Sequence, residues 1–526
     1  MATQKDINLA FQMIVSTASD MDMCLPQAAK QHNEKLSVDE QKKMLAAFAR
    51  YVSEGHPGFA TENAPNITFS EETKNKFKTE LVKLYLTTKQ ERTEEEIGKE
   101  IFKLAKKYIP DNHFNVYSSE GASINTLMSK EEHLAFKEEL QTYIQTENLD
   151  SSHRCVLDHL YTERHQVGKN LFLDDEFELL KQNGAEIVSE KKGQTWRMAE
   201  INHQGKKLML FGMKSFAPIS SDGKIDIDKI NDFTSLAKEF SKQEYENCDA
   251  LILDLRSNGG GWPHIGDYIA RTLYGNTVST EAQGHLKMDT LAAKLSYFYM
   301  EKADKKNSTI DRLKLKDEPQ RTQYVQQDKL WGEEHPFNSA LGYTKPILLL
   351  TDQNTGSNAE LTIGRLREHP YVRTIGDHSC GVIQYHPAAT SNSAIPLPYG
   401  LKISLPPEGF TSTHGERLEG TGYVPDYKVE KGQSALLTCL EKLDEIKQEI
   451  SQNLPPERTV ETEAKRESHI DKTDNIIIKN IGENNPQLKN AFNELLNATS
   501  TIPQLQAPER QNVYSLHQQK YGILTH

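Results

Sequence analysis

Short strand-like runs separated by helical patterns mark the middle of the chain. Four of them are bounded by turn residues: Leu208–Met213, Ala250–Leu255, Ile347–Leu350 and Val372–Ile375. Runs of this length, rich in branched apolar residues, predict buried strands. Segments with helical periodicity, Ile225–Phe240 and Ile265–Leu273, lie between successive runs. Because a helix between two strands favours a right-handed crossover, the pattern predicts largely parallel pairing.

The rest of the chain divides into segments of different character. Residues 1–108 predict an N-terminal helical domain, and residues 109–205 predict a mixed α/β segment. Residues 206–435 hold the strand and helix rhythm, which a charged insertion at 276–340 interrupts. Residues 436–526 predict a helical tail with a charged, Pro-containing linker. The length of 526 residues agrees with about three domains.

Two local signals place elements within these segments. Thr93, followed three residues later by Glu96, predicts the N-terminal cap of a helix that ends at Pro110. The loose alternation of apolar and polar residues from Gly184 to Ile201 predicts a β-hairpin.

A polar turn, Asp352–Gly356, follows the third strand-like run and leads into the first candidate for chemistry. Ser357 comes directly after this turn and opens a helical pattern. We therefore expect Ser357 at the carboxyl end of a strand, where free N–H groups and the helix dipole stabilise a developing oxyanion. Ser357 and Glu360 also form an S-x-x-E capping box, so a structural cap is the alternative interpretation.

A glycine turn, Gly259–Gly261, follows the second run and forms the second candidate. Glycines let the backbone turn its N–H groups outward, since they carry no Cβ. We expect the N–H of Gly260, or of Gly259, to form an oxyanion hole together with the N–H of Asn358. Both turns leave the same carboxyl edge if the sheet is parallel. The alternative is a plain strand-to-helix connection.

Five motifs occur in order between residues 205 and 430. They are Lys214-Ser215-Phe216, Leu253–Gly261, Thr355–Glu360, Gly376–Gln384 and Leu418–Asp426. In this order they resemble the tail-specific, or C-terminal-processing, serine protease family. The resemblance implies a mixed α+β and α/β fold with a crotonase/ClpP-like core of strand-strand-helix units, here flanked by the N-terminal helical domain and the helical C-terminal appendage. It places Ser357 on the nucleophile and Gly260 on the oxyanion donor.

The chain departs from the family's Ser–Lys pattern. Val382 stands where that branch has lysine, and no lysine occurs between Ser357 and Lys402. A serine needs a base to become a nucleophile at neutral pH. The tricorn-type branch of the family uses Ser, His and Glu, and its upstream histidine segment resembles Asp111-Asn112-His113-Phe114. His113 is therefore the expected base.

Two roles, the base and the carboxylate that orients it, each have more than one candidate residue. His378 and His386 compete with His113 as the base, because they lie closer to Ser357 in sequence. By resemblance, Glu419 is the carboxylate that orients the histidine, and Glu416 is its alternative.

Composition narrows the function without identifying it. The net charge of −13 argues against a nucleic-acid binder, and no apolar run is long enough for a membrane span. Five scattered cysteines and the lack of a secretory signal predict a protein that is cytoplasmic or exported without a classical signal peptide. No metal site and no cofactor are expected, and the sequence leaves a homo-oligomer open.

The predicted function is peptide-bond hydrolysis by a serine endopeptidase through Ser357, His113 and Glu419, with a protein or peptide as substrate. A catalytically inactive scaffold that binds peptides or protein partners is the main alternative, motivated by the missing lysine. An acyl-CoA enzyme of the crotonase type is a third reading, since the core folds are related.

Overall fold

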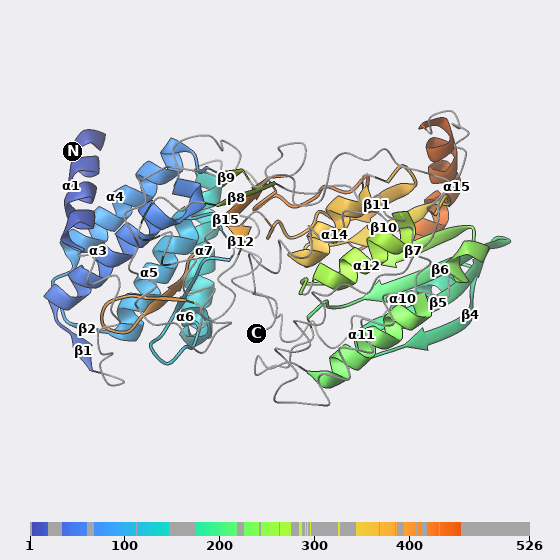
Figure 1. Ribbon diagram of the computed structural model, residues 1–526, viewed down its shortest axis with the longest axis horizontal. Helices are drawn as coiled ribbons and strands as arrows, with labels where there is room; N and C mark the ends of the chain where they lie inside the picture. Colours follow the sequence, from blue (N-terminus) through green and yellow to red (C-terminus); the bar gives the residue numbers. More distant parts are fainter. Residues whose placement is uncertain are drawn as a thin grey trace. The chain divides into compact units, whose positions relative to one another are not determined.

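The computed structural model of the chain contains two compact units, each made of three stretches of sequence (Figure 1). Unit 1 comprises Met1–Arg164, Ala282–Asp328 and Gln384–Gly420, and unit 2 comprises His165–Glu281, Lys329–Ile383 and Thr421–His526. The structure describes residues 3–18, 34–59, 68–111, 113–146, 174–217, 226–240, 244–261, 263–274, 283–286, 290, 292, 295, 325–326, 343–367, 369–383, 385–386, 394–406, 408–411, 418–430 and 432–453.

Unit 2 is built on a seven-stranded sheet in the order β16-β11-β10-β7-β6-β5-β4. Its strands are β4 (Ala185–Lys192), β5 (Trp196–His203), β6 (Lys206–Met213), β7 (Ala250–Asp254), β10 (Ile347–Thr351), β11 (Val372–Gly376) and β16 (Tyr427–Lys428). Pairing is parallel from β6 through to β16 and antiparallel in the hairpin from β4 to β6. The predictions of a largely parallel sheet and of a hairpin near residues 184–201 are therefore confirmed.

Helices cover both faces of this sheet, which explains the continuous apolar runs of its central strands. They are α10 (Asp174–Gln182), α11 (Ile227–Phe240), α12 (Pro263–Tyr274), α14 (Asn358–Arg367) and α15 (Ala435–Asn453), with a short 3₁₀ turn, η3 (Glu244–Asn247). Leu436, Leu443 and Ile446 of α15 share a core cluster with Leu348 and Leu350 of β10. Strand β10 is thus buried and packs against α15, and the turn towards Ser357 begins at its carboxyl end.

Unit 1 is mainly helical in its N-terminal stretch. Its helices are α1 (Gln4–Thr17), α3 (Val38–Gly55), α4 (Glu71–Thr87), α5 (Glu94–Tyr108), α6 (Ile124–Leu127) and α7 (Lys130–Thr146), with a 3₁₀ turn, η1 (Pro57–Phe59). Thr93 caps α5 through a complete capping box with Glu96, as predicted. Apolar residues from these helices form one core with Ile395, Ile403 and Leu405, which come from much later in the chain.

Three small sheets complete unit 1. Strand β1 (Lys35–Leu36) pairs with β2 (Arg92–Thr93), and β3 (Asn115–Tyr117) pairs with β14 (Lys402–Ser404), which pairs in turn with β13 (Ile395–Pro396). The third sheet has the order β12 (Tyr385–His386), β15 (Glu408–Thr411), β8 (Gln283–Leu286) and β9 (Val325–Gln326). No helix among the described residues is both long and apolar enough to cross a bilayer. Most of the predicted insertion at 276–340 lies outside the described residues.

Candidate active site

Ser357 lies in unit 2 between the end of β10 and the start of α14, where the strand-turn-helix pattern predicted it. Its backbone has a φ of +55°, which is in the left-handed region and unusual for a residue other than glycine. Strained conformations of this kind gather at active sites, and sharp strand-to-helix turns are known to present nucleophilic serines. The Ser357 hydroxyl has no hydrogen-bond partner within the described part of the chain.

The predicted capping box forms only in part. Glu360 Oε2 accepts the Ser357 N–H at 3.0 Å, but the Glu360 N–H donates to the Ser357 carbonyl oxygen at 2.8 Å instead of to the hydroxyl. Glu360 therefore holds the backbone of Ser357, while the side chain of Ser357 is not used as a cap.

Glu360 also fixes the segment that follows β11. Its fully buried carboxylate accepts hydrogen bonds from Ser379 Oγ at 2.6 Å, from the Gly381 N–H at 2.7 Å and from the Val382 N–H at 2.9 Å. Burial raises the pKa of Glu360 to about 7, and these hydrogen bonds act against that rise. Val382 thus contributes its backbone N–H to holding a buried glutamate.

The glycine turn and the serine turn touch each other. A Cβ added to Gly260, whose φ is +87°, would lie 2.7 Å from the backbone nitrogen of Asn358 and 2.8 Å from Ser357 Cβ. The Gly356 N–H donates to the Asn258 carbonyl oxygen at 2.9 Å. Parallel pairing of β7 with β10 brings both turns to one carboxyl edge, as expected.

The N–H groups of these turns differ in availability. The Gly260 N–H donates to Asn258 Oδ1 at 2.9 Å, and the Asn258 side chain is fully buried. The N–H groups of Gly259 and Asn358 have no acceptor among the described residues. An oxyanion hole at this place thus has two uncommitted donors, and the third is held by Asn258.

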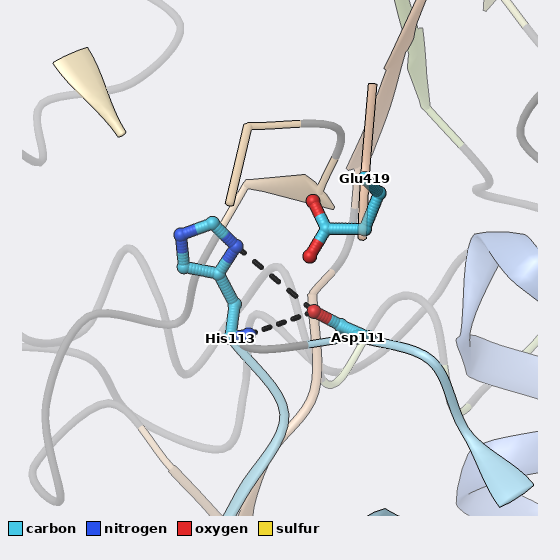
Figure 2. Close-up of side chains that lie close together, drawn as sticks. All are labelled: Asp111, His113 and Glu419. Atoms are coloured by element: carbon cyan, nitrogen blue, oxygen red, sulfur yellow. Dashed lines mark hydrogen bonds and ion pairs between the residues drawn. The ribbon is translucent and has the colours of Figure 1, made fainter. Parts of the chain in front are cut away.

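His113 lies in unit 1, between the end of α5 and the start of β3. Its side chain is 12% exposed, and its Nδ1 is buried with no hydrogen-bond partner in the described parts of the chain. Asp111 Oδ1 lies 3.9 Å from that Nδ1 and accepts the His113 backbone N–H at 2.8 Å (Figure 2). Burial lowers the pKa of His113 to about 4, so the imidazole is neutral and can accept a proton at neutral pH.

Two further buried polar residues, His56 and Lys106, contact the segment that carries this histidine. His56 Nε2 lies 2.8 Å from Asp111 Oδ2, and neither side chain is exposed. Lys106 Nζ donates to the carbonyl oxygens of Asp111 and Phe114, at 3.3 and 2.6 Å. Burial lowers the pKa of Lys106 to about 8, although the negative charges of Asp111 and Glu419 oppose this shift.

Glu419 is fully buried, and its carboxylate lies beside Asp111 and His113 (Figure 2). One ligand atom from each of these three residues lies within 4.8 Å of the other two, a spacing from which a metal site can form. Tetrahedral zinc requires ligand atoms at about 2.0–2.2 Å from the ion. The Lys106 ammonium group already supplies a positive charge next to both carboxylates. The cluster therefore fits an ion-pair network better than a cation site.

Of the alternative site residues Glu416, His386 and His378, the structure describes the side chain of His378 alone. Glu416 and the side chain of His386 lie outside the described residues. His378 follows β11 in unit 2, and its Nδ1 lies 2.8 Å from Asp377 Oδ1. Asp377 also accepts a hydrogen bond at 2.7 Å from Gln353, in the turn that leads to Ser357. His378 thus stays a rival base on the same sheet edge as Ser357.

Sequence reasoning missed three residues of these clusters. Glu360 was recognised only as a capping residue, and His56 and Lys106 were not singled out. His56 follows α3 directly and is its C-cap, so the signal available was a helix end and nothing more. Lys106 sits among other lysines of α5, and only its burial distinguishes it from them.

Comparison with known proteins finds a family-model match for the region that carries Ser357. Residues 222–429 match the model of peptidase family S41, which confirms the predicted resemblance to tail-specific serine proteases. The match supports a serine peptidase, with a peptide or protein as its substrate. No characterised protein sequence matches the chain significantly.

Solved structures resemble the chain at low identity. A putative peptidase from Parabacteroides merdae is 14% identical with a TM-score of 0.40, and the alignment covers 77% of this chain and 93% of that one. A lipoprotein from Streptococcus agalactiae is 14% identical with a TM-score of 0.33, covering 79% and 99%. Mature CPAF complexed with lactacystin is 17% identical with a TM-score of 0.32, covering 51% and 56%. None of these likenesses bears on the site.

Proposed function

We propose that the protein is a serine endopeptidase of the C-terminal-processing type that works through Ser357, His113 and Glu419. The observation that carries this proposal is the left-handed Ser357, which lies against a glycine turn at the carboxyl edge of a parallel sheet. This arrangement falls within the segment that matches peptidase family S41. A crotonase/ClpP-like core is part of the proposal.

The chemistry follows from the protonation states. Neutral His113 takes the proton from the Ser357 hydroxyl as the oxygen attacks the substrate carbonyl, and the imidazolium then gives that proton to the leaving amine. Water hydrolyses the resulting acyl-enzyme by the same route in reverse. Glu419 orients the imidazole and stabilises its charged form. Ser357 and His113 belong to different units, and the proposal assigns them one reaction.

The oxyanion of the tetrahedral intermediate would be stabilised by backbone donors. We assign the N–H of Asn358 together with that of Gly259 or Gly260. The assignment of the Asn358 N–H is supported by its position at the start of α14, where the helix dipole favours negative charge. Use of the Gly260 N–H requires it to be released from, or shared with, Asn258 Oδ1.

The substrate is a peptide or protein segment, and we propose that it binds in extended form by backbone hydrogen bonds to a strand edge. Homo-oligomer formation, the absence of a metal or cofactor and the cellular location stay predictions.

A fluorophosphonate probe with intact-mass detection tests the nucleophile. We expect one label on the wild type, no label on Ser357→Ala, and loss of peptide hydrolysis in Ser357→Ala by on the order of 10³-fold or more. Ser379→Ala is the matched control, since this nearby serine hydroxyl is committed to Glu360. Labelling that survives Ser357→Ala would refute the assignment.

The base is tested by comparing two histidine variants. His113→Gln is expected to lose activity by on the order of 10²–10⁴-fold, while His378→Gln keeps most of it. The reverse result would transfer the role to His378, which Asp377 already orients.

The missing lysine motivates a second candidate function, a peptide-binding scaffold without catalysis. A folded wild-type protein that binds peptides but is never labelled by the probe would favour this reading. Tight binding of coenzyme A would instead revive the crotonase-type alternative.

A further inference from the structure

We propose that Asp111, oriented by His56, is a second carboxylate that positions His113, keeping the imidazole proton on Nδ1 and leaving Nε2 free as the base. This inference rests on the proposed function and extends it to two residues that the triad does not include. All the contacts that carry it lie within unit 1.

The protonation state of His56 follows from its two neighbours. The Gly58 backbone N–H donates to His56 Nδ1 at 2.9 Å, so Nδ1 carries no proton. The proton of the neutral ring is therefore on Nε2, which lies 2.8 Å from Asp111 Oδ2 and donates to it. A charged imidazolium would place two donors face to face at Nδ1. His56 is thus a fully buried donor, and Asp111 Oδ2 accepts its Nε2 proton.

Asp111 is held as a charged acceptor in spite of its burial. Burial alone would raise the pKa of Asp111, but the hydrogen bond from His56 and the nearby positive charge of Lys106 hold this pKa below its usual value. With Oδ2 occupied by His56, Oδ1 is the oxygen left to face His113.

Asp111 Oδ1 acts on both the backbone and the ring of His113. It accepts the His113 N–H at 2.8 Å and lies 3.9 Å from Nδ1, which has no hydrogen-bond partner among the described residues. A negative oxygen at that place favours a proton on Nδ1 over a lone pair. Figure 2 shows Nδ1 on the side of both carboxylates, Asp111 and Glu419, while the other ring nitrogen is directed away from them; the 3.9 Å contact is the one to Asp111.

Lys106 fixes the loop on which this pairing depends. Its ammonium group bridges the carbonyl oxygens of Asp111 and Phe114, which flank His113 on either side. Its positive charge also compensates the two buried carboxylates, Asp111 and Glu419. These two hydrogen bonds thus keep Asp111 and His113 close together, and a shortening of about 1 Å would bring Oδ1 and Nδ1 within hydrogen-bond range.

The tautomer of His113 is the direct test, because it does not depend on activity. In protein labelled with nitrogen-15 histidine, the resonances of His113 are assigned by their loss in His113→Gln. We expect the wild type at neutral pH to carry the proton on Nδ1. Asp111→Asn, which keeps the size of the side chain and removes its charge, is expected to move the proton to Nε2. Glu419→Gln, measured in parallel, should move it less.

Kinetics separates positioning from a merely structural role. Asp111→Asn is expected to lower kcat by about 10²–10⁴-fold with KM changed less than about threefold. His56→Gln retains a donor for Asp111 and an acceptor for Gly58 and should keep most of the activity and the Nδ1 tautomer. His56→Leu lacks both groups and should reproduce the tautomer shift of Asp111→Asn. Circular dichroism and thermal unfolding confirm that each variant folds.

The outcomes distinguish the two hypotheses. A tautomer that stays on Nδ1 in folded Asp111→Asn overturns the positioning role, as does a shift that occurs only in Glu419→Gln. If the tautomer shifts as expected but the wild type neither reacts with the fluorophosphonate probe nor cleaves peptides, the positioning role stands and the proposed peptidase function fails.

Discussion

The two parts of the proposed site are built in different ways. Ser357 is presented by regular structure, a parallel strand followed by a turn and a helix, and its own backbone N–H is held by the Glu360 carboxylate. His113 lies in an irregular loop and is surrounded by buried side chains with charges or hydrogen-bonding rings. The Ser357 part depends on the parallel order of the strands and on the glycine turn beside it. The His113 part depends on ionisable groups that are buried together.

Burial acts in opposite directions on the ionisable group that each part contains. It raises the pKa of Glu360, beside Ser357, to about 7 and lowers the pKa of His113 to about 4. Both shifts have the same physical cause, since a buried environment disfavours the charged form of each group. The pKa of the carboxyl group therefore lies above that of the imidazole, the reverse of the usual order. The imidazole is neutral throughout the physiological range, and the carboxyl group titrates near neutral pH.

Removal of the Glu360 side chain should have the largest effect on stability. Glu360→Ala leaves three backbone N–H groups and the Ser379 hydroxyl without their buried acceptor, and it opens a cavity. We expect a loss of about 3–5 kcal/mol in the free energy of unfolding of unit 2, measured by denaturant titration. Glu178→Ala, which removes an exposed glutamate of α10 in the same unit, should cost less than about 1 kcal/mol. Equal losses in both variants would refute the importance of the Glu360 cluster.

The opposite pKa shifts predict mirror-image pH dependences of stability. The raised pKa of Glu360 means that its contribution to stability is lost as pH rises from about 4.5 to about 7. The lowered pKa of His113 means that its contribution is lost as pH falls from about 6.5 to about 4. Each effect is worth on the order of 3 kcal/mol across its window.

Two variants separate these effects. Relative to the wild type, Glu360→Gln should gain stability as pH rises through its window, and His113→Gln should gain stability as pH falls. The measurement is denaturant unfolding from pH 4 to pH 8, with the unfolding of the two units followed separately. A difference from the wild type that is flat with pH in either variant would contradict the corresponding pKa shift.

This contrast also explains what the sequence could predict. The strands of unit 2, the helix that follows Ser357 and the cap at Thr93 come from local patterns of apolar and polar residues, and all are present. The contact between His56 and Asp111 joins residues that are 55 positions apart, and no periodicity links them. The shift of the Glu360 pKa depends on a loop that follows the next strand. Buried polar partners are set by tertiary packing, which local patterns do not encode.

The contact between the two turns of unit 2 can be tested with a pair of glycines. Gly260→Ala combines a strained positive φ with a Cβ placed 2.7 Å from the backbone of Asn358. Gly205, in the β5–β6 turn, has a similar φ of +77° but open space where a Cβ would stand. We expect Gly205→Ala to cost about 1 kcal/mol and Gly260→Ala about 1–3 kcal/mol more, with loss of probe labelling at Ser357. Equal costs would show that the two turns do not depend on their close contact.

The smallest effect concerns the part of the His113 region that local sequence does determine. Thr93 caps α5, the helix that carries Lys106 and leads to His113, so Thr93→Ala should reduce the stability of unit 1 by about 1 kcal/mol. Thr142 lies within α7, and among the described residues its hydroxyl bonds the Glu138 carbonyl oxygen of its own helix, at 2.9 Å. The same substitution there should be neutral or slightly stabilising, because alanine has the higher helix propensity and Thr142 caps nothing. If thermal unfolding shows that Thr→Ala destabilises unit 1 at position 93 but not at position 142, the capping hydrogen bond, and not the presence of a hydroxyl, supports the helix. Because His113 is held by Asp111 and Lys106, its tautomer should be the same in both variants.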